Sequence, residues 1–257
     1  MKRIYTLLFA VLVTSSVFAQ EGGSDQKSVR FGIVVNPGLS WLKSSKIGQE
    51  GNGVSGSFGY GLHLEFRISD YVGFATGISQ SNYNGKVIYN SSVDTINLYY
   101  AKTVSGVLQN PDTSQIKSRR YHFNSIDLPF KLKFKTPEIG YFTYFAELGV
   151  VANINYKVSA RDNSLIIGGS SVVLNDDLEQ IDVNDDTNWY RIGSTVNAGF
   201  EYNFVGSTSL LVSVNWGNSF TNALRSESRD LSYKASGLAF KQSAKLDYIG
   251  LTVGVLF

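Results

Sequence analysis

The sequence predicts an all-β chain, folded as an eight-stranded antiparallel up-and-down transmembrane β-barrel with short periplasmic turns and long extracellular loops. Apolar side chains recur at every second position in eight segments, which is the period of a β-strand. Beyond the N-terminal segment no apolar run reaches the ~20 residues of a membrane helix. Short and long connections alternate along the chain, which is typical of barrels whose two ends lie on opposite sides of a membrane.

The N-terminus has the pattern of a secretory signal peptide. Lys2 and Arg3 precede an apolar run that the small residue Ala19 ends, so cleavage is expected near Ala19-Gln20. The run is too short to span a bilayer, which disfavours the alternative of a retained anchor helix. The predicted organisation is a signal peptide, a short N-terminal segment and one barrel domain, at residues 1–19, 20–28 and 29–257.

The composition argues against one class of partner and indicates how the chain is stabilised. Of 23 basic residues two lie in the signal segment, so the mature chain has 21 basic and 21 acidic residues. This balance argues against a nucleic acid partner, which requires a basic surface. The chain has no cysteine, so an exported form needs a large core or a closed, hydrogen-bonded barrel for stability. We expect no cofactor.

Eight segments are expected to be strands, at residues 29–42, 58–69, 71–83, 121–135, 141–158, 189–204, 208–216 and 246–257. In the first segment Pro37 interrupts the alternation. In the second, Leu62 and Leu64 alternate with His63 and Glu65. In the third, apolar residues at even positions alternate with glycine, alanine and serine. Each segment therefore has one oily and one polar or small face.

The later segments follow the same rule. In 121–135 the apolar residues alternate with charged ones such as Asp127 and Lys133, and in 141–158 the opposite face includes Glu147. In 189–204 the polar face includes Arg191 and Glu201, 208–216 alternates more briefly, and 246–257 alternates with glycine and threonine. Tight turns are expected at 69–70, 136–140 and 205–207. Long loops are expected at 43–57, 84–120, 159–188 and 217–245.

Aromatic residues decide which face meets lipid. One group lies near the short turns or the chain end, namely Tyr71, Tyr141, Phe142, Tyr144, Tyr202, Phe204 and Phe257. A second group lies near the long loops, namely Tyr156, Trp189, Tyr190 and Trp216. Two such bands are expected of a barrel at the two membrane interfaces. The oily faces are therefore predicted to touch lipid. A soluble periplasmic barrel, with the faces reversed, is the alternative.

The polar faces would then point into the lumen. An eight-stranded barrel is only wide enough for its own side chains, and unpaired buried charge is costly. We therefore predict a structural network of paired lumen charges, comprising Glu65, Arg67, Asp127, Lys131, Lys133, Glu147, Arg191 and Glu201.

Several stretches resemble a known family. They are "GLHLEFRISD", "SIDLPFKLKFK", "YFAELGVVANI", "VNAGFEYNF" and the terminal "GLTVGVLF". In this order, after a signal peptide, they resemble the PorT-like or "porin family" outer-membrane β-barrel proteins of Gram-negative bacteria. The resemblance covers residues 29–257 and implies an eight-stranded barrel in the outer membrane. It does not imply one activity, since fold alone does not give function. Some members are associated with protein secretion.

Two features outside the lumen network are candidate sites. Lys117, Arg119 and Arg120 lie where the second long loop re-enters the barrel, where they would bind lipopolysaccharide phosphates or form an ordinary solvated rim. The acidic loop 175–186 includes the first three ligand spacings of a calcium loop, but it lacks the required glycine and the final glutamate. A solvated acidic loop is the preferred interpretation.

Catalysis has few candidates. The chain has two histidines, His63 and His122, and neither has a serine beside it on the same strand face. We therefore expect a non-enzymatic, monomeric outer-membrane protein with a structural or interaction role. Its partners would be outer-membrane lipid and lipopolysaccharide, and an extracellular or secretion partner bound through the long loops. The alternatives are a lipid-modifying enzyme and a small-solute channel.

Overall fold

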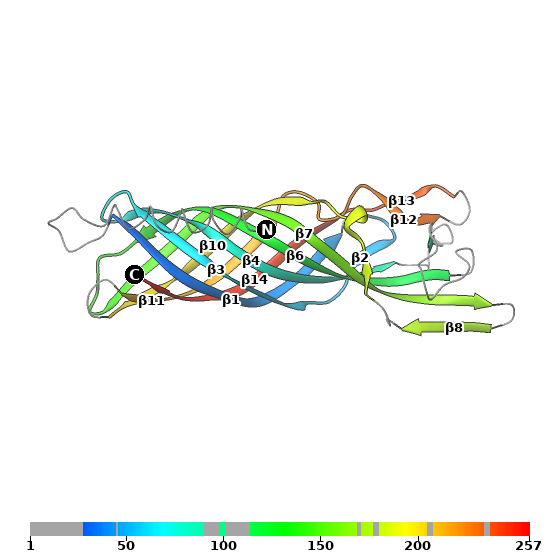
Figure 1. Cartoon of the computed structure of the whole chain (residues 1–257), viewed down its shortest axis with the longest axis horizontal. Coiled ribbons are helices and arrows are strands. Elements are labelled where there is room, and N and C mark those ends of the chain that lie inside the picture. Colours follow the sequence, from blue (N-terminus) through cyan, green and yellow to red (C-terminus); the bar gives the residue numbers. More distant parts are fainter. Residues whose placement is uncertain are drawn as a thin grey trace, which may run out of the picture.

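The computed structural model describes residues 28–44, 46–89, 98–100, 114–168, 171–176, 180–204, 208–233 and 237–257. The predicted signal peptide and most of the short N-terminal segment lie outside these residues. The described chain forms an elongated barrel, with the C-terminus at one end and the strands β8, β12 and β13 projecting from the other (Figure 1). None of its helices has the length and apolarity needed to cross a membrane.

The structure is almost entirely β. Its elements are β1 (Val29–Ser44), β2 (Gln49–Gly51), β3 (Ser55–Arg67), β4 (Val72–Tyr89), β5 (Leu98–Tyr100), β6 (Ser114–Lys135), β7 (Phe142–Gly168), β8 (Ser171–Asp176), β9 (Ile181–Asp182), the 3₁₀ helix η3 (Asn184–Asp186), β10 (Tyr190–Asn203), β11 (Ser209–Ser219), β12 (Glu227–Tyr233), β13 (Ala239–Lys241) and β14 (Ala244–Leu256).

Eight long strands close into a ring. Their spatial order is β1, β3, β4, β6, β7, β10, β11 and β14, and β14 pairs with β1 to complete the circle. Every neighbour in the ring is antiparallel and follows its predecessor in sequence among these eight strands, which is an up-and-down meander. The predicted fold class is confirmed. Closure leaves no sheet edge within the ring, as a strand-built membrane span requires.

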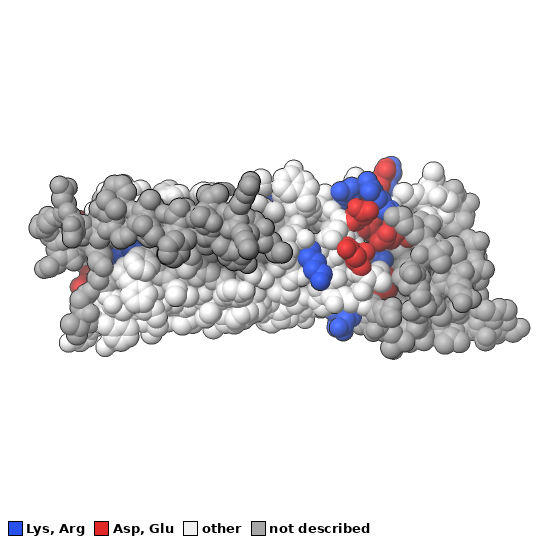
Figure 2. Space-filling model, viewed as in Figure 1, with Lys and Arg blue, Asp and Glu red and all other residues white. Residues whose placement is uncertain are grey.

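The oily faces point outward. On β3, Leu62 is 48% exposed and Leu64 is 36% exposed, whereas His63 and Glu65 between them are buried. The same alternation runs through the wall, which is nearly free of charge over the described surface in Figure 2. A water-facing wall of this kind would be unstable, and a lipid-facing wall is the stable arrangement.

Further along the same strands the inward positions become apolar and the outward positions become polar. On β6 the residues Leu132 and Phe134 face outward and Lys133 faces the lumen. Toward the start of β6, Phe123 is fully buried inside and Arg120 is exposed outside. The part of the barrel near the tight turns, called the lower part below, therefore has an apolar exterior and a charged interior. In the part toward β8, β12 and β13, called the upper part, apolar residues such as Phe123 lie inside and charged residues such as Arg120 lie outside.

The strands are longer than predicted from the sequence. The prediction followed one apolar face, and that pattern ends where the polarity of the two faces is exchanged. The loops expected at 84–120 and 159–188 begin or end as strand, since β4 runs to Tyr89, β6 starts at Ser114 and β7 runs to Gly168. Short strands add to these extensions: β2 pairs with β4, and β8 and β9 pair with β7. The loops predicted at 84–120 and 159–188 are therefore shorter than expected. The extended ends of β4, β6 and β7, together with the short strands β2, β5, β8, β9, β12 and β13, form a β-structured cap at this end of the barrel.

Candidate functional site

The lumen is filled in three layers, and the lowest is an ion-pair network centred on Lys133. Its ammonium group lies 2.7 Å from Glu65 and also binds Glu201, while Glu147 is 3.9 Å away. The side chain is fully buried and also lies 4.2 Å from the centre of the Phe145 ring. One cation is thus shared by three carboxylates, which distributes the cost of burying each charge.

Neighbouring cations complete this layer. Lys131 binds Glu147, and Lys135 binds Glu65. Arg30 donates to Glu201 at 2.5 Å and to the Ser209 hydroxyl at 2.7 Å. Arg30 and Lys135 were not in the predicted network. Arg30 was detectable, since it alternates with Val29 and Phe31 and therefore lies on the inward face of β1.

Arg67 departs from the predicted network. It belongs to the end of β3 and pairs with Asp70 in the tight turn, where both side chains are accessible. Its distance from the strand centre explains the difference, because the last inward position of a strand opens onto the barrel mouth. The structure thus brings Glu65, Lys131, Lys133, Glu147 and Glu201 together and leaves Arg67 outside.

The middle layer is polar but only partly ionic. Asp127 accepts hydrogen bonds from the Tyr83 hydroxyl at 2.8 Å and from the Asn153 amide at 2.5 Å. The guanidinium of Arg191 lies 5.3 Å from the Tyr83 ring and 5.6 Å from the Phe123 ring, as in cation–π contacts. Asp127 is therefore satisfied by an amide and a hydroxyl rather than by a direct ion pair. Arg191 contacts two rings and donates to Ser125 Oγ at 3.4 Å, while its buried Nε has no hydrogen-bond partner among the described residues.

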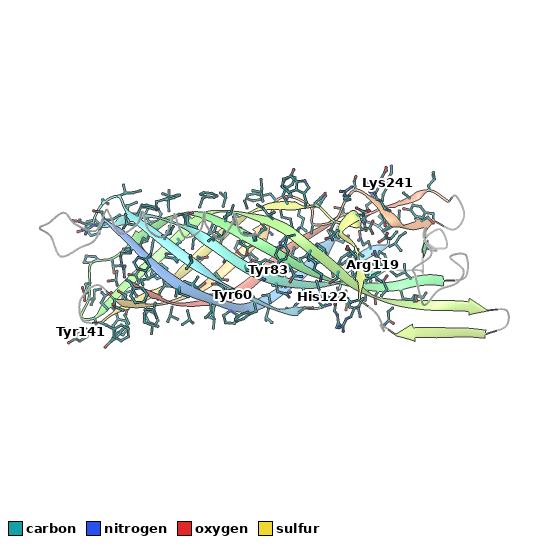
Figure 3. The ribbon with its side chains drawn as sticks, viewed as in Figure 1. Tyr60, Tyr83, Arg119, His122, Tyr141 and Lys241 are labelled. Atoms are coloured by element: carbon teal, nitrogen blue, oxygen red, sulfur yellow. The ribbon has the colours of Figure 1, made fainter. Side chains whose placement is uncertain are left out.

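A cavity of about 100 Å³ lies beside this layer, lined by Ser57, Ser79, Asp127, Lys131 and Asn197 among others. Small residues on the β1, β3 and β4 side leave this space, which is sufficient for several water molecules. Tyr248 also lines this space, and its ring lies against Gly217, where any Cβ would lie 2.2 Å from the ring. Figure 3 shows Tyr83 in the middle of the barrel length.

The upper layer is an apolar core. It lies inside the cap and consists of Leu42, Tyr83, Val87, Tyr89, Ile116, Tyr121, Phe123, Val158, Ala160, Val183, Ala223, Leu224, Leu231, Phe240, Ala244 and Leu246. Burial raises the pKa of the Tyr89 hydroxyl to about 12 and also raises the pKa of Tyr121 well above its usual value. This core resembles that of a soluble β-protein and blocks the upper end of the lumen.

One arginine organises the polar part of the cap. Arg119 is fully buried and binds Asp162 at 2.7 and 2.8 Å, Asp186 at 3.1 Å and Asp230 at 3.5 Å. Burial alone would lower the pKa of Arg119, but the carboxylate of Asp162 outweighs it and the pKa rises above its usual value. Arg119 therefore cannot contact lipopolysaccharide, and its assignment to an exposed rim is wrong. It faces inward on β6, while Arg120 faces outward.

The acidic loop is largely structured. Asp186 is fully buried and accepts hydrogen bonds from Ser228 Oγ, the Arg229 backbone and Arg119. Asn184 Oδ1 accepts from the Val158 backbone N–H, and Asp182 Oδ1 from that of Asn184. The preferred interpretation of a solvated loop is therefore wrong for Asp186. Among the described residues no group of three or more His, Cys, Asp or Glu is arranged to hold a metal ion.

The two histidines lie in different parts of the barrel and have different neighbours. His63 is buried in the lower lumen and stands opposite Gly32 and Gly77, neither of which offers a nucleophile. His122 lies on the outer face of β6 near the cap, where its Nδ1 is 2.6 Å from Asn84 Oδ1 (Figure 3). Ser159 is opposite His122 on β7, but its hydroxyl is buried and accepts a hydrogen bond from Gln180.

Comparison with known protein families is decisive for the identity of the barrel. Residues 18–225 match the model described as "Outer membrane protein beta-barrel domain". The chain belongs to this family. It is therefore an outer-membrane protein, and its short turns are expected on the periplasmic side with the cap outside the cell. None of the curated proteins compared with the chain matches it in sequence.

Solved structures of outer-membrane proteins align with the chain. Neisserial surface protein A has 10% sequence identity and a TM-score of 0.41, covering 92% of this chain and 98% of that protein. Ail of Yersinia pestis has 9% identity, 90% and 100% coverage and a TM-score of 0.36. OprG of Pseudomonas aeruginosa has 12% identity, 88% and 93% coverage and a TM-score of 0.38. At these scores the alignments carry no information on the function of this family member.

Proposed function

We propose that this outer-membrane barrel is a non-enzymatic, non-conducting scaffold that presents its cap for recognition at the cell surface. The observation that supports this most strongly is the filled lumen. The Lys133 network blocks the lower part, and the cap core blocks the upper part. A rigid, packed cap above the membrane is suited to holding a binding surface in place.

The competing channel function is tested by conductance. The chain is reconstituted in planar bilayers and compared with the variant Leu231→Gly/Phe240→Gly, which empties part of the cap core. We expect no single-channel steps from the unmodified protein. Regular steps from the unmodified protein, unchanged in the variant, would contradict the proposal, because they would show a path that bypasses the cap.

Lipid hydrolysis is the second candidate function, and the row Asn84, His122 and Ser159 favours it most. A nucleophilic serine has to donate its proton to the imidazole. In the structure Ser159 Oγ accepts a hydrogen bond from the Gln180 amide, and His122 Nδ1 contacts Asn84 Oδ1 instead. We expect purified protein to release no fatty acid from phospholipid or lipid A. Release that His122→Ala or His63→Ala abolishes would establish an enzyme instead.

On the same reasoning, we propose the cap as the site that binds recognition partners. The described sheet ends on both sides in short strands, β13 and β8, which lie outside the closed ring. Such strand edges and their flanking surfaces are common protein-binding sites. A secretion partner, the role associated with some PorT-like relatives, is one form of this role. A deletion strain with an unchanged profile of secreted proteins would contradict that form.

A further inference from the structure

We propose that the outer wall of the cap binds the phosphate groups of a glycolipid headgroup in the outer leaflet, through Lys86, Arg120 and Arg161. These residues form one row across three neighbouring strands. Lys86 on β4 stands opposite Arg120 on β6, and Arg120 stands opposite Arg161 on β7. Directly opposed side chains of a sheet have Cβ atoms about 5 Å apart, so the row places three cations side by side.

The row faces outward. Its chain neighbours Val87, Tyr121 and Ala160 are fully buried in the cap core, and alternation therefore directs the three cations away from the core. Arg120 and Arg161 are exposed and Lys86 is half-buried.

The row makes no ion pair among the described residues, although the exposed Glu50 on β2 and Asp182 on β9 lie diagonally beside its two ends. Among the described residues, the ion pairs of this region connect Arg119 with three aspartates inside and Arg229 with Asp185, and none includes a member of the row. Like charges directly opposite each other destabilise a sheet. An external anion at this position would remove that repulsion. Asp182 lies on β9 opposite Ser159, and its Oδ1 is hydrogen-bonded to the Asn184 backbone.

The height of the row fits a lipid headgroup. On β4 it lies eight residues beyond Ile78, the last apolar residue of the lipid-facing wall on this strand, and six residues beyond Gln80 at the upper edge of that wall. For a tilted strand this is about 15 Å above that edge. Polar interface and headgroups occupy about 5–8 Å on each side of the hydrocarbon. Long basic side chains extend back toward the bilayer by snorkelling, so the cations lie above the polar interface and extend toward phosphates of the headgroup layer.

Between the row and the apolar wall lies a polar strip that suits the sugar part of such a lipid. It holds two side-chain pairs, the amides of Asn82 and Asn124 at 2.8 Å and the Asn84 amide with the His122 imidazole. Amides of this kind donate to and accept from sugar hydroxyls. Below the strip a chain of hydrogen bonds joins Tyr60, Gln80 and Tyr156 at the upper edge of the lipid-facing wall.

The side chains of the row, the strip and the wall together indicate which class of ligand would bind. The guanidinium fork of arginine binds phosphate in a bidentate manner, and a row of three cations suits a headgroup with more than one phosphate. Amides for sugar and an apolar wall for acyl chains extend the site downward. A phosphorylated glycolipid such as lipid A satisfies all three layers, while free phosphate would use only the first.

The test measures binding of bisphosphorylated lipid A to the full chain in zwitterionic detergent. Changing Arg120→Gln/Arg161→Gln should weaken binding at least about tenfold, because charge-assisted hydrogen bonds are lost. Dephosphorylated lipid A should bind the unmodified protein as weakly as lipid A binds this variant. The matched control is Arg229→Gln/Lys241→Gln, which also removes two exposed cations, but ones that lie beside Asp185 and Glu227. It should leave binding nearly unchanged.

A second readout separates a binding role from a structural one. Without lipid A, the variant Arg120→Gln/Arg161→Gln should unfold at the same or a higher temperature, because repulsion is relieved. With lipid A, only the unmodified protein and the control should gain stability. Arg120→Lys/Arg161→Lys keeps the charges and loses the forks, so it should bind with intermediate affinity. Equal binding by the unmodified protein and the glutamine variant would overturn the proposal, as would full competition by inorganic phosphate or equally tight binding of phosphatidylglycerol.

Discussion

Two halves of the same strands differ in which side is oily. Along β6, Leu132 faces lipid and Lys133 faces the lumen, but beyond Ser125 the order is reversed, with Phe123 inside and Arg120 outside. The backbone and the pairing continue through the change, with a register shift near Asn124. The backbone therefore does not determine the polarity of either face.

The medium outside the wall determines it. In the membrane half the exterior is hydrocarbon, so apolar residues face out and the interior is filled with charges that neutralise one another. In the cap the exterior is water, so apolar residues pack inside as in a soluble protein. On β4 and β6 the point of reversal marks the membrane surface. The two halves should therefore respond differently to the same kind of substitution.

Loss of the central lumen cation should have the largest effect. Lys133→Met leaves Glu65 and Glu201 with reduced compensation in a buried site, and it should lower the free energy of unfolding by roughly 3–5 kcal/mol. Denaturant titration of the barrel in lipid vesicles measures this. Lys135→Met is the matched control, since Lys135 is partly accessible and leaves Lys133 in place. Equal losses in the two variants would show that Lys133 is not the centre of the network.

Emptying the cap core should destabilise the cap and spare the membrane half. Phe240→Ala removes a fully buried ring from β13 and should cost about 3 kcal/mol, as for other buried phenylalanines. Hydrogen exchange should show faster opening of β12 and β13 with β3 and β14 still protected. Simultaneous loss of protection in all four strands would mean that cap and barrel unfold as one unit.

A lysine on the outer face should be costly only below the reversal. Leu132→Lys places a charge against hydrocarbon and should cost about 2–3 kcal/mol. Ile88→Lys places the same charge on the outer face of the cap and should change stability by about 0.5 kcal/mol or less. Denaturant titration of both variants compares the two halves directly. A similar cost at both positions would remove the distinction between a lipid exterior and a water exterior.

The smallest effect concerns alkaline pH and the cap alone. Burial raises the pKa of Tyr89 to about 12, above the value of about 10 for an unfolded chain. A group with a raised folded pKa contributes stability that is complete below pH 10 and is lost as pH rises toward 12. We expect cap protection against protease to fall over this interval, and Tyr89→Phe to fall less. Tyrosine absorbance near 295 nm follows the ionisation.

The sequence was sufficient for the membrane half and insufficient for the cap. Residues such as Leu62 and Glu65 alternate without interruption, so strand, face and lumen could be predicted from a period of two. At Asn82 and Asn124 the apolar residues change face, and an analysis that follows one oily face ends the strand there. The extensions of β4, β6 and β7 were therefore interpreted as loops.

The same limit explains the charged residues. Arg119 and Arg120 are adjacent in sequence, and only the strand register shows that one is buried with Asp162 while the other stands opposite Lys86 and Arg161. Partners more than 40 residues apart, such as Arg119 with Asp162, depend on pairing that a single sequence does not reveal. Composition and alternation indicated that lumen charges exist, and pairing decided which of them meet.

The most direct test of the reversed faces and the filled lumen is thiol labelling in intact outer membranes, since the chain has no cysteine of its own. Single cysteines are placed at Leu62 on the lipid face, Thr195 in the lumen and Arg229 on the cap, and each is treated with a charged, water-soluble maleimide and with a lipid-soluble one. We expect the charged reagent to label only Arg229→Cys, the lipid-soluble reagent to label Leu62→Cys as well, and neither to reach Thr195→Cys. Rapid labelling of Leu62→Cys by the charged reagent would show that the oily face meets water, and labelling of Thr195→Cys would show an open lumen.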